Sequence, residues 1–337
     1  MIKNRLFDYL SLELCQEIKE ISLHVNSVYN INRIQNLRKK YPEIPVGELL
    51  SIFSLQRRYQ AKLKIADNWI LTDKNAQQAS SYHVAQYHGL LFQPFNSCAD
   101  LCCGIGMDLY FLSQDKALCY AVDLSEEILT YAEYNMSLSG KQNVSYQCIR
   151  AEDFSDSVDA VFIDPDRRID EKRSINPFNM SPDLPSLEGL ALRYPKMVVK
   201  LSPMLDYDKY DFFSQGKLHF VSENNELKEI LFCSKMFSPV DPSKTCVILP
   251  EMAIFKSGGL KKSDISAIQD YLYEPDVSII KAHLIEELAY ELNLNRIDPF
   301  LALLTSNEQI NSQLVKNYKV DKIMDFSLKE INVFLNK

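Results

Sequence analysis

Apolar residues recur at helical spacing near the start of the chain. In the segment 47–64, Leu49, Ile52, Phe53 and Leu63 recur near helical spacing, and two prolines, Pro42 and Pro45, mark a break before it. No pattern of catalytic residues accompanies this spacing. We therefore predict an N-terminal helical region, residues 1–66.

From residue 97 onward, short apolar runs alternate with helical stretches, which is typical of βαβ units on a mostly parallel sheet. One helical stretch, Ser125–Leu138, places several apolar residues on one face. The pattern predicts an α/β, Rossmann-like fold. Its predicted strands are Cys98–Leu101, Ala117–Val122, Val144–Ile149, Val158–Ile163 and Met197–Leu201.

The C-terminal third has a different pattern. Residues 216–234 read as two strands joined by a turn at Glu223–Glu226, and 245–255 adds another apolar run. These strands either complete the sheet or begin a small α+β module. Beyond a linker candidate at 256–262, apolar residues follow one helical face from the start signal Glu274–Asp276. They are Val277, Ile280, Leu284, Leu288 and Leu292.

Composition restricts the class of protein. The chain has 337 residues, a net charge of -8 and a pI near 5.3, which argues against a broad nucleic-acid-binding surface. An RNA partner would need a local basic patch. No apolar run approaches the roughly 20 residues of a membrane span, and the N-terminus lacks a secretory signal pattern. We expect a cytoplasmic protein that is not bound to a membrane.

Cysteine and histidine spacing does not favour a metal site. Cys102 and Cys103 are adjacent and project to opposite sides, and no CxxC pair occurs among the eight cysteines. His83 and His88, five residues apart, are expected at the surface or as helix caps. We expect no bound metal.

A glycine-containing loop follows the first predicted strand. It runs from Asp100 through Gly104 and Gly106 to a predicted helix. A dinucleotide site of the G-x-G-x-x-G type would require a third glycine where Leu109 stands. S-adenosylmethionine has no pyrophosphate, so this looser turn suffices for it. The terminal acid of the strand, Asp100, would hold the positively charged methionine portion.

An acidic residue ends the second predicted strand at the expected distance. Asp123 lies 19 residues after Gly104, where an acid can bind both hydroxyls of a ribose. The alternative role for Asp123 is to cap the next helix, but Ser125 is an equally good cap. We therefore assign Asp123 to the ribose.

Two further loops follow the third and fourth predicted strands. Glu152 and Asp153 stand where an adenine edge would lie, and the choice between them, or a solvated acidic loop, stays open. The turn Asp164–Arg168 follows the fourth strand, where the methyl acceptor of such a sheet would sit. Asp164 and the Pro165 carbonyl supply hydrogen-bond acceptors, and Arg167 and Arg168 can hold a phosphate or a carboxylate.

The ordered motifs DLCCGIGMD, AVDLS, RAEDF and VFIDPDRR resemble those of class I S-adenosylmethionine-dependent methyltransferases. Together with the later segments VKLSP and YLYEPD, these motifs make the sequence similar to bacterial members of the family that carry a THUMP-like domain. The resemblance implies a methyltransferase domain at 67–209, a ferredoxin-like module at 210–260 and a THUMP-like domain at 265–337. It also implies an RNA substrate, tRNA or rRNA. The cofactor residues would be Asp100, Cys102, Gly104, Ile105, Gly106, Asp123, Leu124, Glu152 and Asp153, and the substrate side would be Asp164, Pro165, Arg167 and Arg168.

Two departures from the usual motifs affect the substrate. Cys102 replaces a common glycine, and Asp166 stands where amino-group methyltransferases often have a second proline. No Pro-Cys pair is present, so carbon-5 methylation lacks its thiolate and a nitrogen or oxygen acceptor is expected. Two alternatives remain. One is a methyltransferase for a small molecule or a protein, and the other is a non-catalytic RNA-binding protein with a vestigial cofactor site.

Overall fold

The structure is a computed structural model. It describes residues 13–22, 28–64, 69–166, 168–169, 172–173, 175–237, 243–259, 261–324 and 327. The chain divides into two compact units, Met1–Gly216 with Leu231–Pro239, and Lys217–Ile230 with Val240–Lys337. The four domains predicted from the sequence stay predictions.

The N-terminal part of the first unit is helical. Apolar residues of α2, α3 and α4, among them Ile18, Leu37 and Leu49, form a core with Tyr131 of the later helix α8 (Glu126–Leu138). Trp69 is also buried. The helices are α2 (Glu13–Ser22), α3 (Val28–Lys40), α4 (Val46–Leu63), α5 (Asp73–Gln78) and α6 (Tyr82–Phe92).

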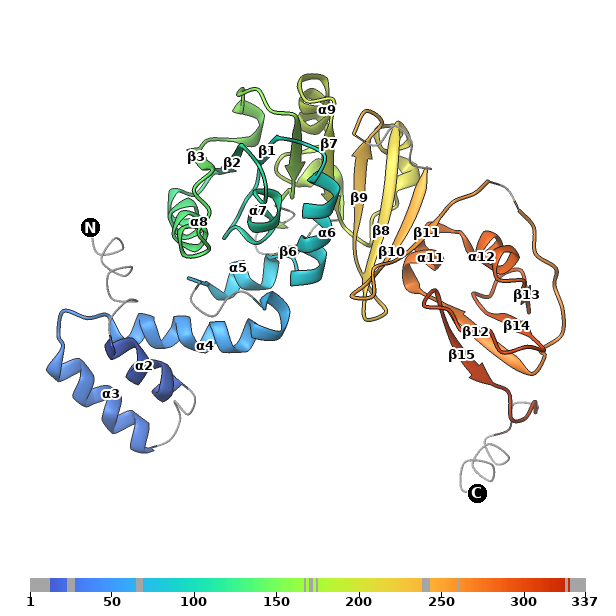
Figure 1. Cartoon of the computed structure of the whole chain (residues 1–337), viewed down its shortest axis with the longest axis horizontal. Coiled ribbons are helices and arrows are strands. Elements are labelled where there is room, and N and C mark those ends of the chain that lie inside the picture. Colours follow the sequence, from blue (N-terminus) through green and yellow to red (C-terminus); the bar gives the residue numbers. More distant parts are fainter. Residues whose placement is uncertain are drawn as a thin grey trace. The chain divides into compact units, whose positions relative to one another are not determined.

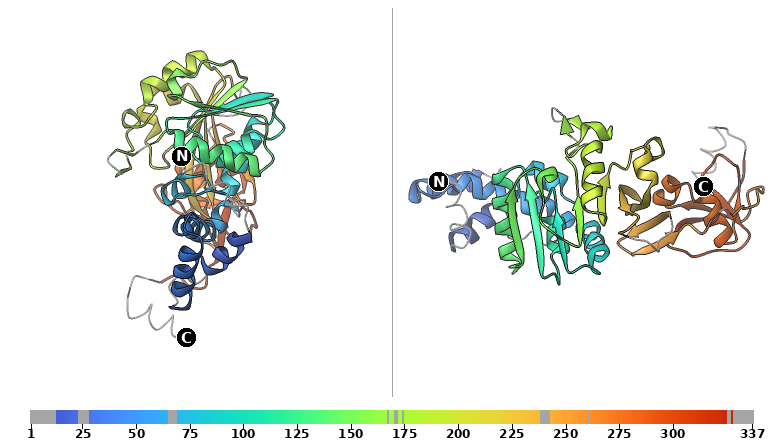
Figure 2. Two further views of the ribbon diagram at one scale, coloured as in Figure 1. Left: turned by 90° about the vertical axis from the view of Figure 1, so that its left-hand side faces the viewer. Right: turned by 90° about the horizontal axis from the view of Figure 1, so that it is seen from above.

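A parallel sheet follows in the same unit. Its strand order is β7-β4-β1-β2-β3. Strands β2 and β3 are thus added on one side of β1, and β4 and β7 on the other. Open α/β sheets bind ligands at the carboxyl ends of the strands beside such a switch point. Each of these strands overlaps one that the apolar runs predict. Figure 2 shows them side by side. The strands are β1 (Ser97–Asp100), β2 (Leu118–Asp123), β3 (Val144–Cys148), β4 (Ala160–Ile163) and β7 (Met197–Leu201).

Helices and short segments connect and extend this sheet (Figure 1). The C-terminal end of β9 (Glu226–Ser234) lies beside β7, where the Met197 amide donates to Ser234 Oγ at 2.9 Å. The helices are α7 (Met107–Leu112), α8 (Glu126–Leu138), α9 (Leu184–Arg193) and α10 (Asp211–Ser214). The short segments are the 3₁₀ turns η2 (Ala151–Asp153), η3 (Pro177–Asn179) and η4 (Tyr207–Lys209) and the strands β5 (Arg168–Ile169) and β6 (Lys172–Arg173).

The second unit contains strands of two sheets. Strands β8 (Gly216–Glu223), β10 (Lys244–Leu249) and β11 (Ala253–Lys256) have the order β11-β10-β8. The predicted turn before β9 is confirmed, because Asn224 and Asn225 have φ of 52° and 59°, as a two-residue hairpin requires. The other sheet has the order β13-β14-β12-β15, with strands Asn295–Arg296, Leu304–Ser306, Tyr271–Pro275 and Val315–Lys319.

The helical prediction for this unit was partly wrong. Asp276 caps a helix as expected, since its side chain accepts from the Ser278 amide at 2.8 Å. However, the apolar face from 277 to 292 is divided between α11 (Val277–Ala282) and α12 (Ile285–Glu291). His283 between them adopts a left-handed conformation with φ of 59°, which ends α11.

Candidate functional site

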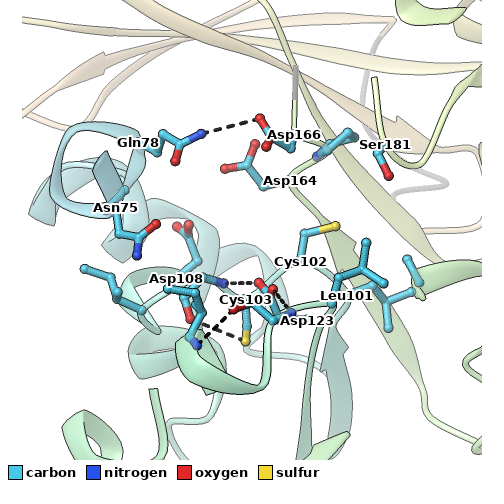
Figure 3. Close-up of a pocket in the computed structure, with 18 of the residues that line it drawn as sticks. Asn75, Gln78, Leu101, Cys102, Cys103, Asp108, Asp123, Asp164, Asp166 and Ser181 are labelled. Carbon is cyan, nitrogen blue, oxygen red and sulfur yellow. Dashed lines mark hydrogen bonds between the residues drawn. The ribbon is translucent and has the colours of Figure 1, made fainter. Parts of the chain in front are cut away.

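A cavity of about 570 Å³ lies beyond the carboxyl ends of the parallel strands. Its volume is in the range of ordinary small-molecule sites. Figure 3 shows the glycine loop and Asp123 on one side and the Asp164 turn on another, with Asn75 and Gln78 of α5 beside them. The polar lining residues used below are Lys74, Asn75, Gln78, Cys102, Gly104, Asp108, Asp123, Glu152, Asp164, Asp166, Ser181 and Lys200.

The glycine loop and Asp123 form one hydrogen-bonded unit. Gly104 N donates to Asp123 Oδ2 at 3.1 Å, and Ser125 N donates to Oδ1 at 3.0 Å. Ser125 caps α8 by accepting from the Ile128 amide, as expected, so the Asp123 carboxylate is not the helix cap. Gly104 has φ of +52°, and a Cβ there would meet no atom within 4 Å. The loop therefore leaves room for a ligand against its backbone.

Asp100, at the end of β1, is a buried carboxyl. Only 1% of the residue is exposed, and Oδ1 accepts from the Cys102 amide at 3.4 Å. Oδ2 has no hydrogen-bond partner among the described residues. Burial and the nearby Asp108 carboxylate raise the pKa of Asp100 well above its usual range. A cationic ligand close to Asp100 would stabilise its ionised form.

Some of the remaining predicted cofactor residues line the cavity and others do not. Ile105 and Leu124 line the cavity, whereas Gly106 belongs to the same loop but does not. Of the two adenine candidates, Glu152 lines the cavity and Asp153 is exposed and does not. This geometry favours Glu152. All of these binding roles stay predictions.

On the substrate side, Asp164 is held by a lysine that the sequence reading did not select. Lys200 Nζ lies 2.7 Å from Asp164 Oδ2, and only 8% of the lysine side chain is exposed. Pro165 also lines the cavity. Arg167 lies outside the described residues, and Arg168 begins β5 with no described side chain. The structure thus joins Asp164 to Lys200, and the roles of both arginines stay predictions.

A buried polar network continues from Lys200 toward the protein interior. Lys200 Nζ donates to Ser80 Oγ at 3.1 Å, and Ser80 Oγ donates to Asp108 Oδ2 at 2.9 Å. Asp108 Oδ1 lies 2.7 Å from His88 Nδ1, and His88 is fully buried. The expectation that His88 lies at the surface or caps a helix was therefore wrong, because Asp108, twenty residues later, provides a buried partner.

Ionisation of Asp108 is expected to stabilise the fold. Desolvation raises the pKa of Asp108, but the His88 ring, Lys200 and Ser80 outweigh it, so that its pKa is lowered. We expect Asp108→Asn to reduce the free energy of unfolding by about 2 kcal/mol at pH 7. Because the pKa of Asp108 is lower in the folded than in the unfolded state, its ionisation stabilises the fold fully at pH values above the unfolded-state pKa. This stabilisation is lost as the pH falls through the folded-state pKa.

Urea unfolding of both proteins checks this prediction. The difference between wild type and Asp108→Asn should be constant above about pH 5 and shrink at lower pH. A difference that does not change between pH 7 and pH 3 would contradict the assigned charge.

Several residues that line the cavity lie outside the four sequence motifs and were not predicted from the sequence. Asn75 and Gln78 belong to α5, whose polar sequence gives no sign of a site. Ser181 arrives through a backbone pairing with Asp166. Lys200 did carry a signal, because it is a lone charge in the apolar strand β7.

The described residues contain no group of three or more His, Cys, Asp or Glu side chains arranged to hold a metal. Among the helices that the structure describes, none combines the length and apolar character of a membrane span.

Comparisons with known proteins give structural matches alone. No protein-family model matches the chain, and no curated protein matches it significantly. A candidate methyltransferase from Porphyromonas gingivalis W83 is 20% identical with a TM-score of 0.73, over 95% of this chain and 86% of that chain.

Two smaller structures match part of the chain. An rRNA methylase from Streptococcus thermophilus is 14% identical with a TM-score of 0.34, over 45% of this chain and 95% of that chain. A candidate methyltransferase from Streptococcus mutans, solved with SAH, is 13% identical with a TM-score of 0.35, over 46% of this chain and 99% of that chain. The likeness to the P. gingivalis protein shows the fold: the chain has a Rossmann-like methyltransferase fold and, in its second unit, a small antiparallel sheet.

Proposed function

We propose that the chain is an S-adenosylmethionine-dependent methyltransferase that modifies an RNA base, in tRNA or rRNA, at nitrogen or oxygen. One observation carries the proposal. The Gly104–Asp123 unit and the Asp164–Lys200 pair line a single cavity at the carboxyl edge of the parallel strands.

The residues of the cavity fit the proposed cofactor. Asp123 would bind the ribose hydroxyls, Glu152 the adenine amine, and the backbone of the Gly104 turn would lie against the ligand. Asp100 does not line the cavity itself, although the next residues, Leu101 and Cys102, do. Its Oδ2 has no partner among the described residues, and its carboxylate would complement the positive charge of the methionine portion from behind the cavity wall. The bound cofactor would supply an activated methyl group on its sulfonium.

The acceptor side is suited to orienting a nitrogen or an oxygen. Asp164 accepts a hydrogen bond from the N–H or O–H of the acceptor, so that the acceptor's lone pair is directed into the cavity. Lys200 keeps the Asp164 carboxylate in one position. Burial and nearby carboxylates raise the pKa of Cys102 well above its usual range, so its thiol stays protonated. A thiolate mechanism at a pyrimidine carbon is therefore disfavoured.

RNA is the substrate class that the motif resemblance supports. The proposed THUMP-like domain, 265–337, contains the described sheet β13-β14-β12-β15 and would contribute to RNA binding. A second candidate substrate class is a small molecule or a protein, and the net charge of -8 favours it.

Radiolabelled methyl transfer distinguishes these candidates. The purified protein and labelled cofactor are incubated with total RNA from a strain that lacks the gene, and the labelled nucleoside is then identified. We expect incorporation into one RNA fraction, and little into RNA from the parent strain, which is already modified. Cofactor binding without label in any RNA fraction would contradict the RNA substrate. Label in a protein or metabolite extract would then support the second candidate.

A further inference from the structure

Positive charge is concentrated in two helices of this acidic protein. Residues 28–64, which form α3 and α4, contain eight Lys or Arg and two Glu, a net charge of +6. Because the whole chain carries -8, all the other residues together carry -14. The helices therefore provide the local basic patch that an RNA partner of this protein would need.

Six of the eight cations of residues 28–64 are exposed, and most of these six form no ion pair with a carboxylate among the described residues. We define the basic strip as Arg38, Lys39, Lys40, Arg57, Lys64 and Lys74, all of them exposed. Within the described part of the chain, none of the six forms an ion pair with a carboxylate. By contrast, Arg58 binds Asp73 at 3.0 Å and Arg33 binds Glu17 at 3.2 Å. The strip is thus not neutralised by neighbouring side chains.

The strip leads to the cavity. Helix α4 has 18 residues, about 27 Å, and its C-terminal end packs against α5. Lys62 Nζ donates to the carbonyl oxygens of Ala76 and Gln77 at 2.9 and 2.8 Å, which fixes α5 against α4. Lys74 of α5 lies on the cavity wall. The cations of the strip therefore lie at the end of α3, in the C-terminal part of α4 and just after it, and on α5 at the rim of the candidate site.

Tyrosine rings accompany the cations. Lys40 lies 4.9 Å from the centroid of the Tyr41 ring, Arg58 5.4 Å from Tyr59, and Lys64 5.4 Å from Tyr82. Basic residues interleaved with aromatic rings are typical of surfaces that contact both the phosphates and the bases of single-stranded nucleic acid.

We propose that the basic strip binds the phosphate backbone of the RNA substrate and leads the acceptor nucleotide to the cavity. This inference rests on the proposed function and extends it to a second RNA-binding surface, separate from the C-terminal region. A membrane-binding helix would expose large apolar side chains. Among residues 31–64, Ile31 is the one exposed large hydrophobic residue, so the composition favours RNA over a lipid surface.

A charge-neutralised variant tests the strip. Lys40→Gln/Arg57→Gln/Lys64→Gln removes three cations from the strip. Lys116→Gln/Lys196→Gln/Lys235→Gln removes three lysines of the same structural unit that lie outside it. Fluorescence anisotropy with labelled tRNA from the deletion strain gives the Kd of each protein between 50 and 200 mM KCl. We expect about tenfold weaker binding for the strip variant and a salt slope smaller by about two, with the control within twofold of wild type.

Two further measurements test whether the variants are folded and where the RNA contacts the protein. Calorimetric titration with S-adenosylmethionine should give the wild-type Kd for both variants, which shows that they are folded and separates this test from that of the cofactor site. Ultraviolet cross-linking of wild type to the same tRNA should label peptides within residues 38–82. Equal tRNA affinity and salt slope for the two variants would overturn the inference. So would cross-links confined to residues 261–324, or binding to phosphatidylglycerol vesicles but not to tRNA.

Discussion

Replacing Asp123 by Ala is expected to weaken the binding of S-adenosylmethionine about 100-fold. The Asp123 carboxylate accepts from the amides of Gly104 and Ser125, so its loss removes two bonds that fix the glycine loop. In the proposed complex it removes the acceptor for the ribose hydroxyls as well. Hydrogen bonds to charged groups contribute about 1.5–3 kcal/mol each, and 2.7 kcal/mol corresponds to about 100-fold in Kd.

Isothermal titration calorimetry measures this effect. Asp153→Ala is a matched control, because Asp153 is an exposed acid of the same unit that does not line the cavity. Its Kd should stay within about twofold of wild type. An unchanged Kd for Asp123→Ala would contradict the assignment of this carboxylate to the cofactor.

The second large effect is expected on catalysis. Asp164→Ala should lower kcat for methyl transfer about 10²- to 10³-fold, because the acceptor loses the carboxylate that orients it. The same change leaves Lys200 buried without the carboxylate at 2.7 Å. The Kd for S-adenosylmethionine should change by less than about threefold, since Asp164 lies apart from the glycine loop and Asp123 (Figure 3).

Steady-state transfer of labelled methyl to RNA from the deletion strain gives kcat, with Asp166→Ala as the control. Asp166 also lines the cavity, but it is exposed, and its side chain accepts a long hydrogen bond, 3.4 Å, from Gln78. It should keep most of the activity. A kcat for Asp164→Ala close to that of wild type would rule out Asp164 as the orienting group.

The sequence was most informative where local pattern and local geometry coincide. Strand β7 has the predicted bounds, Met197–Leu201, because its apolar run is buried along its whole length. The turn at Asn224–Asn225 was predictable because Asn tolerates the left-handed conformation that a tight hairpin needs. Asp123 could be predicted to lie beside the glycine loop because its separation from Gly104 in the sequence corresponds to one βαβ unit.

Contacts between distant segments were not predictable. His88 lies in α6 and has an ordinary sequence context, yet Asp108 and Phe162 contact it in the interior. The break at His283 follows from the packing of two short helices, not from a proline or glycine in the sequence. Helix α5 is held beside the cavity by bonds from α4, which Arg58, Tyr59 and Lys62 supply.

The net charge of the whole chain does not show how charge is distributed along it. A net charge of -8 argues against an RNA partner as long as the chain is treated as a whole. The +6 charge of residues 28–64 becomes meaningful once α4 is known to pack against a helix of the cavity wall. For the proposed RNA substrate, the position of each charge relative to the candidate site therefore matters more than the overall charge.

Equilibrium dialysis of the wild-type protein with labelled S-adenosylmethionine tests the central claim most directly. We predict one bound molecule per chain, saturation in the micromolar range, displacement by S-adenosylhomocysteine, and no displacement by NAD, because Leu109 stands where a dinucleotide site has its third glycine. Absence of bound label at millimolar cofactor, or displacement of the label by NAD, would contradict the account.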